Sequence, residues 1–318
     1  MSYATSTNPP TEDEVLGYFD SLSNWGRWGG DDQRGTLNLI DDQARRRGAA
    51  AVRHGVSVSC AWEVGTRPGG IERNTSAFRS AADLGVPEHA HARWGGSGEH
   101  LCFEFHGIQH THVDSLCHVF WDGRMYNGKP AEMVTNDGGA EWCAVTEAET
   151  GMVTRGVLLD IPALRDEEWL EPGEAVFPEE LEAAEERQGV RVESGDAVLL
   201  RTGFGRMRHS GAGEGVEAIS ATQAGWHASC LPWFRDRGVA FIGADTANDA
   251  MPSGYPGVFF PVHAVGITAL GLWLLDNCDL ETCAATAAYL RQWDFLLSVC
   301  PLRMAGVSGS PVNPIATF

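Results

Sequence analysis

A run of thirteen residues, His106 to His118, constrains this chain more than any other part of its sequence. The run holds four of the 11 histidines and one aspartate, all at even-numbered positions. Side chains alternate between the two faces of an extended strand, so residues two apart share a face. We therefore expect the run to be extended, with His106, His110, His112 and Asp114 on one surface and His118 close to them.

Such a surface predicts a metal site. Imidazole nitrogens and carboxylate oxygens are ligands that Zn²⁺, Mn²⁺ and Fe²⁺ accept in proteins. Without a metal the cluster is difficult to satisfy, because protonated rings repel one another and buried neutral rings each need a hydrogen-bond partner. The alternative, a histidine-rich surface without function, explains single histidines better than it explains a cluster. A metal-dependent enzyme is therefore the leading hypothesis.

Length and composition favour a folded protein that acts on a small molecule. The chain has 318 residues, of which 43% are hydrophobic, and its formal net charge is −20. We expect a single domain over residues 1–318, with residues 1–11 as a flexible arm because they are polar and contain two prolines. The strong negative charge argues against nucleic acid as a partner, since phosphates would be repelled.

The eight cysteines and the N-terminus predict a cytoplasmic protein. None of the cysteines forms a Cys-x-x-Cys pair, which favours reduced thiols over a disulfide framework. The N-terminus has neither a basic nor an apolar segment of the kind found in signal peptides. No apolar run is long enough to cross a membrane, so we expect no membrane partner.

The distribution of apolar residues predicts an α/β fold. Runs typical of buried strands alternate irregularly with segments of helical spacing, without the strict rhythm of a parallel βαβ protein. A mixed sheet with helices packed outside it satisfies this pattern best. Between the first two predicted helices lies a loop rich in tryptophan and glycine, residues 24–32. Trp25 and Trp28 in this loop either line a pocket for an aromatic substrate or pack beneath the loop, and the sequence leaves both readings open.

Several short motifs resemble one known family. Thr111-His112-Val113-Asp114 and His118 match the second half of the signature His-x-Gly-Thr-His-x-Asp-x-Pro-x-His. Later matches are Gly243-Ala244-Asp245, Pro261-Val262-His263 and Leu275-Asp276-Asn277. These residues resemble the cyclase and kynurenine formamidase-like family of metal-dependent hydrolases, which includes isatin hydrolases.

The resemblance implies a swivelling β/α/β fold with a mixed, barrel-like sheet and outer helices, assembled as a homodimer or homotetramer. It also implies a divalent metal, Mn²⁺ or Zn²⁺, and hydrolysis of an amide, formamide or lactone. His112 and Asp114 match metal ligands of the family, and His118 matches its general base or proton shuttle. His263 matches a later catalytic histidine, and Asp276 stands near the place of a glutamate ligand.

The chain departs from the family signature at the first ligand. Ile108 occupies the position of the first histidine, and its hydrocarbon side chain cannot coordinate a metal. His110, where the family has glycine, shares the parity of the ligand face and is our choice for the missing ligand; His106 is the other candidate. Asp276 is shorter than glutamate and lies one residue later than usual. These departures favour one metal over two.

Three functions remain open on these grounds. The first is a hydrolase that opens a cyclic amide or lactone, or cleaves an aryl formamide, by means of a metal-activated water. The second is a metal-dependent cyclase or dehydratase of a biosynthetic intermediate, since activation of a carbonyl serves ring closure as well as ring opening. The third is a small-molecule-binding protein that has lost catalysis, which the substitution at Ile108 favours.

Overall fold

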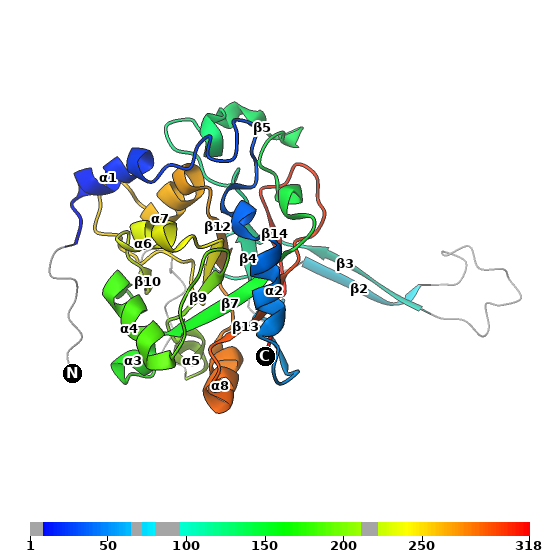
Figure 1. Ribbon diagram of the computed structural model, residues 1–318. Helices are drawn as coiled ribbons and strands as arrows, with labels where there is room; N and C mark the ends of the chain where they lie inside the picture. Colours follow the sequence, from blue (N-terminus) through cyan, green and yellow to red (C-terminus); the bar gives the residue numbers. More distant parts are fainter. Residues whose placement is uncertain (1–8, 65–71, 80–95, 211–221) are drawn as a thin grey trace, which may run out of the picture.

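A nine-stranded mixed sheet forms the centre of the protein (Figure 1). The computed structural model describes residues 9–64, 72–79, 96–210 and 222–318. In spatial order the strands are β1 (Ser57–Ser59), β15 (Ile315–Thr317), β13 (Asp294–Val299), β7 (Met152–Asp160), β9 (Ala197–Arg201), β11 (Phe241–Ala244), β12 (Trp273–Asp276), β4 (His112–Asp114) and β14 (Gly309–Pro311).

The middle of the sheet is parallel, and its edges are antiparallel. β7, β9, β11 and β12 run parallel to one another, whereas β13 joins β7 and β4 joins β12 in the antiparallel direction. Every residue of β9, β11 and β12 is buried. Continuous apolar strands of this kind form where helices or loops cover both faces of a sheet.

Eight α-helices surround the sheet in the described part of the chain (Figure 1). They are α1 (Glu12–Ser21), α2 (Asp42–Ala50), α3 (Ile161–Arg165), α4 (Pro178–Gln188), α5 (Phe204–His209), α6 (Cys230–Arg237), α7 (Pro261–Val265) and α8 (Glu281–Leu290). Single-turn helices are η1 (Gly35–Leu39), η4 (Tyr126–Gly128), η5 (Ala131–Met133) and η6 (Val145–Ala148), and a π-turn, η7 (Gly266–Leu270), continues α7.

Close packing of α2 on the sheet depends on a glycine. The helix lies against β7 and β13. A Cβ atom at Gly48 would lie 2.7 Å from the backbone nitrogen of Arg155 in β7, so only glycine allows this approach. α2 begins at Asp41, whose carboxylate accepts a hydrogen bond from the backbone nitrogen of Ala44, as expected of an N-terminal cap.

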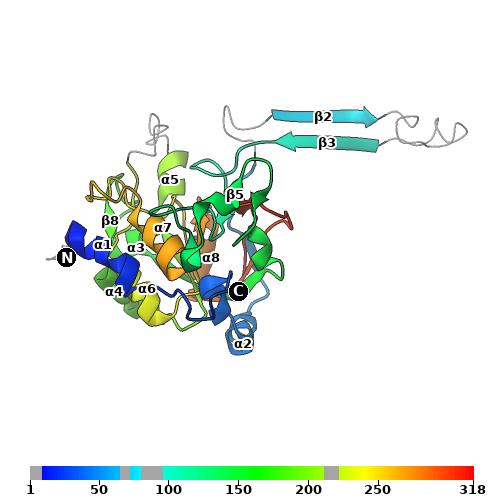
Figure 2. The same cartoon turned by 90° about the horizontal axis from the view of Figure 1, so that it is seen from above.

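Three two-stranded ribbons complete the fold. β2 (Glu72–Arg79) and β3 (Gly96–Cys102) pair with each other and project from the body of the protein (Figure 2). The other ribbons are short and consist of β5 (Val134–Thr135) with β6 (Gly139–Ala140), and β8 (Ala175–Val176) with β10 (Gly225–Trp226). β3 leads directly into the histidine-rich run.

The fold class predicted from the sequence is confirmed: the protein is α/β, with a mixed sheet that curls into a half-barrel and helices around it. The expectation of an extended strand from His106 to His118 is wrong. Residues 106–109 form a turn in which Gly107 has φ 108°, and only His112–Asp114 is a strand. The turn breaks the alternation on which the shared face was predicted.

Two further sequence expectations concern the cysteines and the absence of a membrane-spanning helix. All eight cysteines are free thiols, as the absence of paired motifs indicated. Among the described residues, no helix has the length and apolar character needed to cross a membrane.

Candidate metal centre

Two neighbouring strands bring the first ligand candidates together. β4 pairs antiparallel with β12, so that His112 lies opposite Asp276, and Asp114 lies opposite Leu274. His112 and Asp114 are two residues apart in β4 and share a face of the sheet. Directly opposed residues have Cβ atoms about 5 Å apart, which places the side chain of Asp276 beside that of His112. The local strand pairing therefore assembles the centre of the site.

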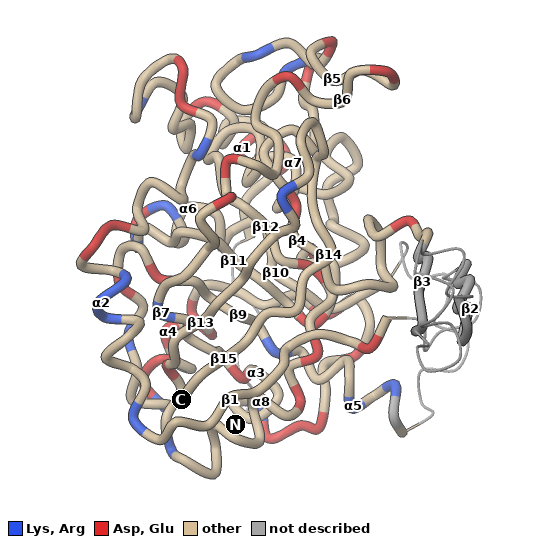
Figure 3. Tube along the Cα trace, turned by 90° about the vertical axis from the view of Figure 1, so that its right-hand side faces the viewer, with Lys and Arg blue, Asp and Glu red and all other residues tan. Residues whose placement is uncertain are grey.

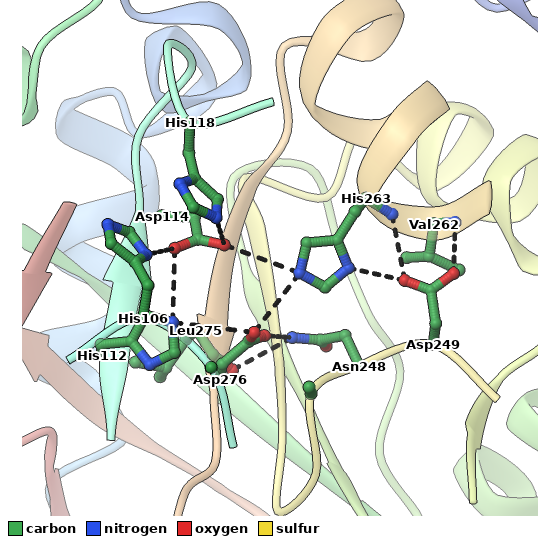
Figure 4. Close-up of polar contacts among 12 residues, drawn as sticks. His106, His112, Asp114, His118, Asn248, Asp249, Val262, His263, Leu275 and Asp276 are labelled. Atoms are coloured by element: carbon green, nitrogen blue, oxygen red, sulfur yellow. Dashed lines mark hydrogen bonds and ion pairs between the residues drawn. The ribbon is translucent and has the colours of Figure 1, made fainter. Parts of the chain in front are cut away.

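The carboxylate of Asp114 is surrounded by imidazole nitrogens (Figure 4). Its Oδ1 lies 2.9 Å from Nδ1 of His106 and 3.4 Å from Nε2 of His112. Its Oδ2 lies 3.6 Å from Nε2 of His263 and 3.7 Å from Nε2 of His118. The aspartate side chain is 1% exposed, so this charge lies inside the protein and needs compensation.

Two groups of side chains have ligand atoms that all lie within 4.8 Å of one another, a spacing suited to a metal ion. The first group is His106, His112 and Asp114, and the second is Asp114, His263 and Asp276. Nε2 of His263 lies 3.3 Å from Oδ2 of Asp276. Because both groups contain Asp114, the arrangement suits one metal, which the sequence favoured, and equally two metals that share this carboxylate.

Hydrogen bonds orient His112 so that one ring nitrogen faces the site. Nδ1 of His112 lies 2.8 Å from the backbone oxygen of His110, which can only accept a hydrogen bond. Nδ1 therefore carries a proton, and Nε2 is the ring nitrogen that faces Asp114. Metal-ligating histidines are commonly fixed in this way by a hydrogen bond from the other ring nitrogen.

Asp249 fixes His263 in the same manner. Oδ2 of Asp249 lies 2.6 Å from Nδ1 of His263 and also accepts the backbone N–H of His263 at 3.1 Å. Oδ1 accepts the backbone N–H of Val262 at 2.7 Å. Through these hydrogen bonds the buried Asp249 holds the start of α7 in place and orients Nε2 of His263 toward the other ligand candidates. Asn248, its neighbour, donates a short hydrogen bond to Oδ1 of Asp276.

Sequence reasoning missed Asn248 and Asp249. They follow β11 after a short connection, and the only signal was that the predicted strand ends in polar residues. Both are buried in the structure, which distinguishes them from an ordinary polar loop.

Charges around the site shift several pKa values. Burial raises the pKa of Asp114, but His118, His106 and His263 outweigh it and hold the pKa well below its ordinary value. Burial lowers the pKa of His263, yet Asp276, Asp114 and Asp249 raise it well above the usual range. Burial is the main cause of a lowered pKa at His118. The ligand candidates therefore form a compact set of opposite charges.

The residues present fit a divalent metal. Both carboxylate oxygens of Asp114 are buried, and within the described chain neither makes a hydrogen bond of good geometry. Taking a carboxylate out of water is costly, and a cation bound between it and the neighbouring imidazole nitrogens would offset that cost. Nitrogen and carboxylate oxygen together are a donor set that Zn²⁺ and Mn²⁺ accept.

The structure places His106, and not His110, beside the predicted ligands. In the described chain both groups of ligand atoms exclude His110, whose ring packs edge-on against Phe103 with centroids 4.9 Å apart. The turn at Gly107 turns His106 back over the site, where its ring stacks on His118 at 3.9 Å. His106 is therefore the better candidate for the ligand that Ile108 cannot provide.

Of the two tryptophans predicted to contact substrate, Trp25 is hydrogen-bonded to η7. Nε1 of Trp25 donates to the backbone oxygen of Thr268 at 2.7 Å, and the ring is 43% exposed. Trp28 lies under the guanidinium of Arg27, 4.7 Å from its ring centroid. Their contact with a substrate stays a prediction.

An apolar cavity of about 850 Å³ adjoins the site through Phe105, although no ligand candidate is among the described residues that line it. Phe105 lines it and is also in contact with the site, its ring centroid 4.5 Å from that of His106 and 6.1 Å from that of His112. The rest of the wall is mostly apolar and includes Trp62, Phe103, Leu302 and Met304. Its size is that of a typical small-molecule site.

The family model described as "Putative cyclase" matches residues 59–249, which include His106, His112, Asp114 and His118. The chain belongs to the cyclase family. No curated protein matches the chain.

Solved structures share the fold. A crystal structure described as a novel cyclase has a TM-score of 0.83 and 25% identity, covering 98% of this chain and 100% of its own. Isatin hydrolase A from Labrenzia aggregata, bound to benzyl benzoate, has a TM-score of 0.55 and 16% identity over 85% of this chain and 96% of its own. Isatin hydrolase A from Ralstonia solanacearum has a TM-score of 0.54 and 17% identity over 98% of this chain and 99% of its own.

Proposed function

We propose that this protein is a metal-dependent hydrolase that opens a cyclic amide or lactone, or cleaves an aryl formamide. The observation that carries the proposal is the buried Asp114 carboxylate with four imidazole nitrogens within 3.7 Å of its oxygens. Membership of the cyclase family and the likeness in fold to isatin hydrolases support the same class of reaction.

His106, His112 and Asp114 would hold the metal, Mn²⁺ or Zn²⁺, with His263 and Asp276 as further ligands. When bound, a divalent metal acidifies a water molecule and polarises a carbonyl group. Asp249 and the backbone oxygen of His110 keep the ligand nitrogens of His263 and His112 facing inward. The protein thus fixes the ligands before substrate arrives, which avoids reorganisation during the reaction.

His118 is placed to move a proton. Its side chain is 29% exposed, more than that of His112 or Asp114, so it lies at the mouth of the site. Its ring is parallel to that of His106, with an interplanar angle of 4°, and its Nε2 faces Asp114 (Figure 4). From there Nε2 accepts the proton of the attacking water and returns it to the leaving nitrogen or oxygen.

The apolar cavity supports an aromatic or otherwise apolar substrate. A ring bound against Phe105 would lie next to His106 and His112, with its scissile bond toward the ligand candidates. The benzyl benzoate bound to the Labrenzia aggregata enzyme is an aromatic ester, which agrees with this choice for the present chain. We further propose that the protein acts in the cytoplasm as a homodimer or homotetramer.

Replacing His118 tests the proposal. His118→Ala should keep its metal but lose most of its turnover of a panel of cyclic amides, lactones and aryl formamides, by about 10²–10⁴-fold. His110→Ala is the matched control, since it removes a histidine of the same run that lies outside both ligand groups. Wild-type turnover by His118→Ala would remove this residue from the mechanism.

The reverse reaction is the second candidate, because the relative with a TM-score of 0.83 is described as a cyclase. The same panel, supplied as ring-opened acids and amines, separates the two directions. Formation of closed rings from these compounds, with no hydrolysis of the closed ones, would make the protein a cyclase.

A further inference from the structure

A small polar cavity of about 190 Å³ lies away from the metal centre, where the ends of α4 and α8 meet β7 and β13. In the sheet, β9 and β11 separate β7 from β12, which carries Asp276. At about 5 Å per strand, the two sites are roughly 15 Å apart across the sheet. The cavity is therefore distinct from the candidate metal centre.

Arginines dominate the wall of this cavity. Arg53, Arg155, Arg191 and Arg291 line it, against two carboxylates, those of Glu193 and Asp294. This local excess of positive charge occurs in a chain whose net charge is −20. More arginines lie on α2 close by, visible as blue segments in Figure 3. An anion repelled by most of the surface would be attracted here.

Two of the arginines are held in a fixed frame. Arg155 donates to Oδ2 of the buried Asp196 from Nε at 3.1 Å and from Nη2 at 2.6 Å. Its Nη2 also donates to the backbone oxygen of Arg191 at 2.7 Å, which holds the neighbouring loop in place. Arg53 donates to both carboxylate oxygens of Asp294, at 2.9 and 3.1 Å.

The other two guanidinium groups are not used in this way. Within the residues that the structure describes, neither Arg191 nor Arg291 forms an ion pair or a side-chain hydrogen bond. Each guanidinium carries five N–H donors in a planar fork that matches the oxygens of phosphate or carboxylate. The cavity thus combines an ordered frame with two solvent-exposed guanidinium groups that are available to an anion.

The backbone conformation of Arg291 also supports an anion site. This residue ends α8 in the left-handed region, with φ 54° and ψ 40°, where glycine is the usual choice. A side chain with a Cβ is disfavoured in that conformation. An arginine here is costly for the helix end, yet it adds a fourth guanidinium to the cavity.

We propose that this cavity binds a multiply charged oxyanion of the phosphate class. Arg191 and Arg291 would form charge-assisted hydrogen bonds with the oxyanion, while Arg53 and Arg155, which are paired with Asp294 and Asp196, hold the wall of the cavity in place. The volume of about 190 Å³ accommodates a phosphate group with part of the molecule that carries it. The proposal does not depend on the reaction at the metal centre.

Calorimetric titration of the metal-loaded protein with inorganic phosphate, at constant ionic strength, tests the site. The wild type should bind phosphate saturably, and Arg191→Ala and Arg291→Gly should each weaken binding by about 10-fold. Arg235→Ala is the matched control, because it removes one exposed charge on α6 and should bind as the wild type does. Phosphate bound at the metal centre would be unaffected by any of these variants.

Arg291→Gly also separates binding from folding. Glycine relieves the left-handed backbone at the end of α8, so this variant should melt at the wild-type temperature or above it while losing affinity. Absence of saturable binding by the wild type would overturn the proposal. Wild-type affinity in both Arg191→Ala and Arg291→Gly would overturn it as well.

Discussion

Asp249→Asn is the most informative single substitution, because it changes the hydrogen-bond partner of Nδ1 of His263 and leaves every ligand candidate in place. The carboxylate of Asp249 accepts three hydrogen bonds, from the backbone of Val262 and His263 and from Nδ1 of His263. An amide nitrogen cannot accept any of them. If the amide oxygen takes the place of Oδ2, Nδ1 of His263 still donates, but to a neutral oxygen and no longer to a carboxylate. If the amide nitrogen takes that place, Nδ1 must accept a hydrogen bond from it, which moves the ring proton to Nε2.

That proton would then lie between Nε2 of His263 and Oδ2 of Asp276, 3.3 Å apart, where the lone pair should face a metal. We expect metal affinity to fall by about 10–100-fold, the usual effect of losing a partner that orients a ligand. Loss of at least one charge-assisted hydrogen bond should also lower the free energy of unfolding of the metal-free protein by roughly 2–3 kcal/mol. Competition with a chelator measures the first effect, and denaturant unfolding measures the second.

Asp245→Asn is the matched control. Asp245 is another buried carboxylate, which accepts hydrogen bonds from Thr202 and from the backbone of Gly203 and Phe204. Its replacement should destabilise the protein yet leave metal affinity close to that of the wild type. If Asp249→Asn bound metal as tightly as the wild type, the assignment of His263 as a ligand oriented by Asp249 would be refuted.

Two further predictions concern other parts of the molecule. Burial lowers the pKa of His227 to about 4, below the value of about 6.5 for an unfolded chain. As the pH drops from 6.5 toward 4, the unfolded chain binds the proton first, so the free energy of unfolding should fall by about 1–2 kcal/mol after allowance for partial exposure. In denaturant unfolding measured across that pH range, His227→Asn should not show this part of the decrease. Phe105→Ala should raise KM for an aromatic substrate by about 5–30-fold with little change in kcat, and an unchanged KM would show that the substrate does not bind in the 850 Å³ cavity.

The sequence predicted the α/β fold because long apolar runs identify the buried strands β7, β9 and β11. His112 and Asp114 also follow from the sequence, since they lie in a true strand, where residues two apart share a face. The rule does not apply to His106 and His110, because residues 106–110 form a turn and a bend and not a strand.

Other features depend on tertiary contacts that no local pattern reveals. Asp249 lies in a connection after β11, and its role is visible only once α7 brings His263 against it. The arginine cavity joins residues from β7, from the loop after α4 and from the end of α8, which are far apart in the sequence. Charge counts alone predicted only an acidic surface.

Metal content of the purified protein tests the central claim most directly. Elemental mass spectrometry should find stoichiometric Mn²⁺ or Zn²⁺ in the wild type and in His110→Ala, and a large loss in His106→Ala. Chelation should lower the melting temperature, because a ligand that binds only the folded state stabilises it. A wild-type protein that contains no metal and takes up none when Mn²⁺ or Zn²⁺ is added would contradict the account.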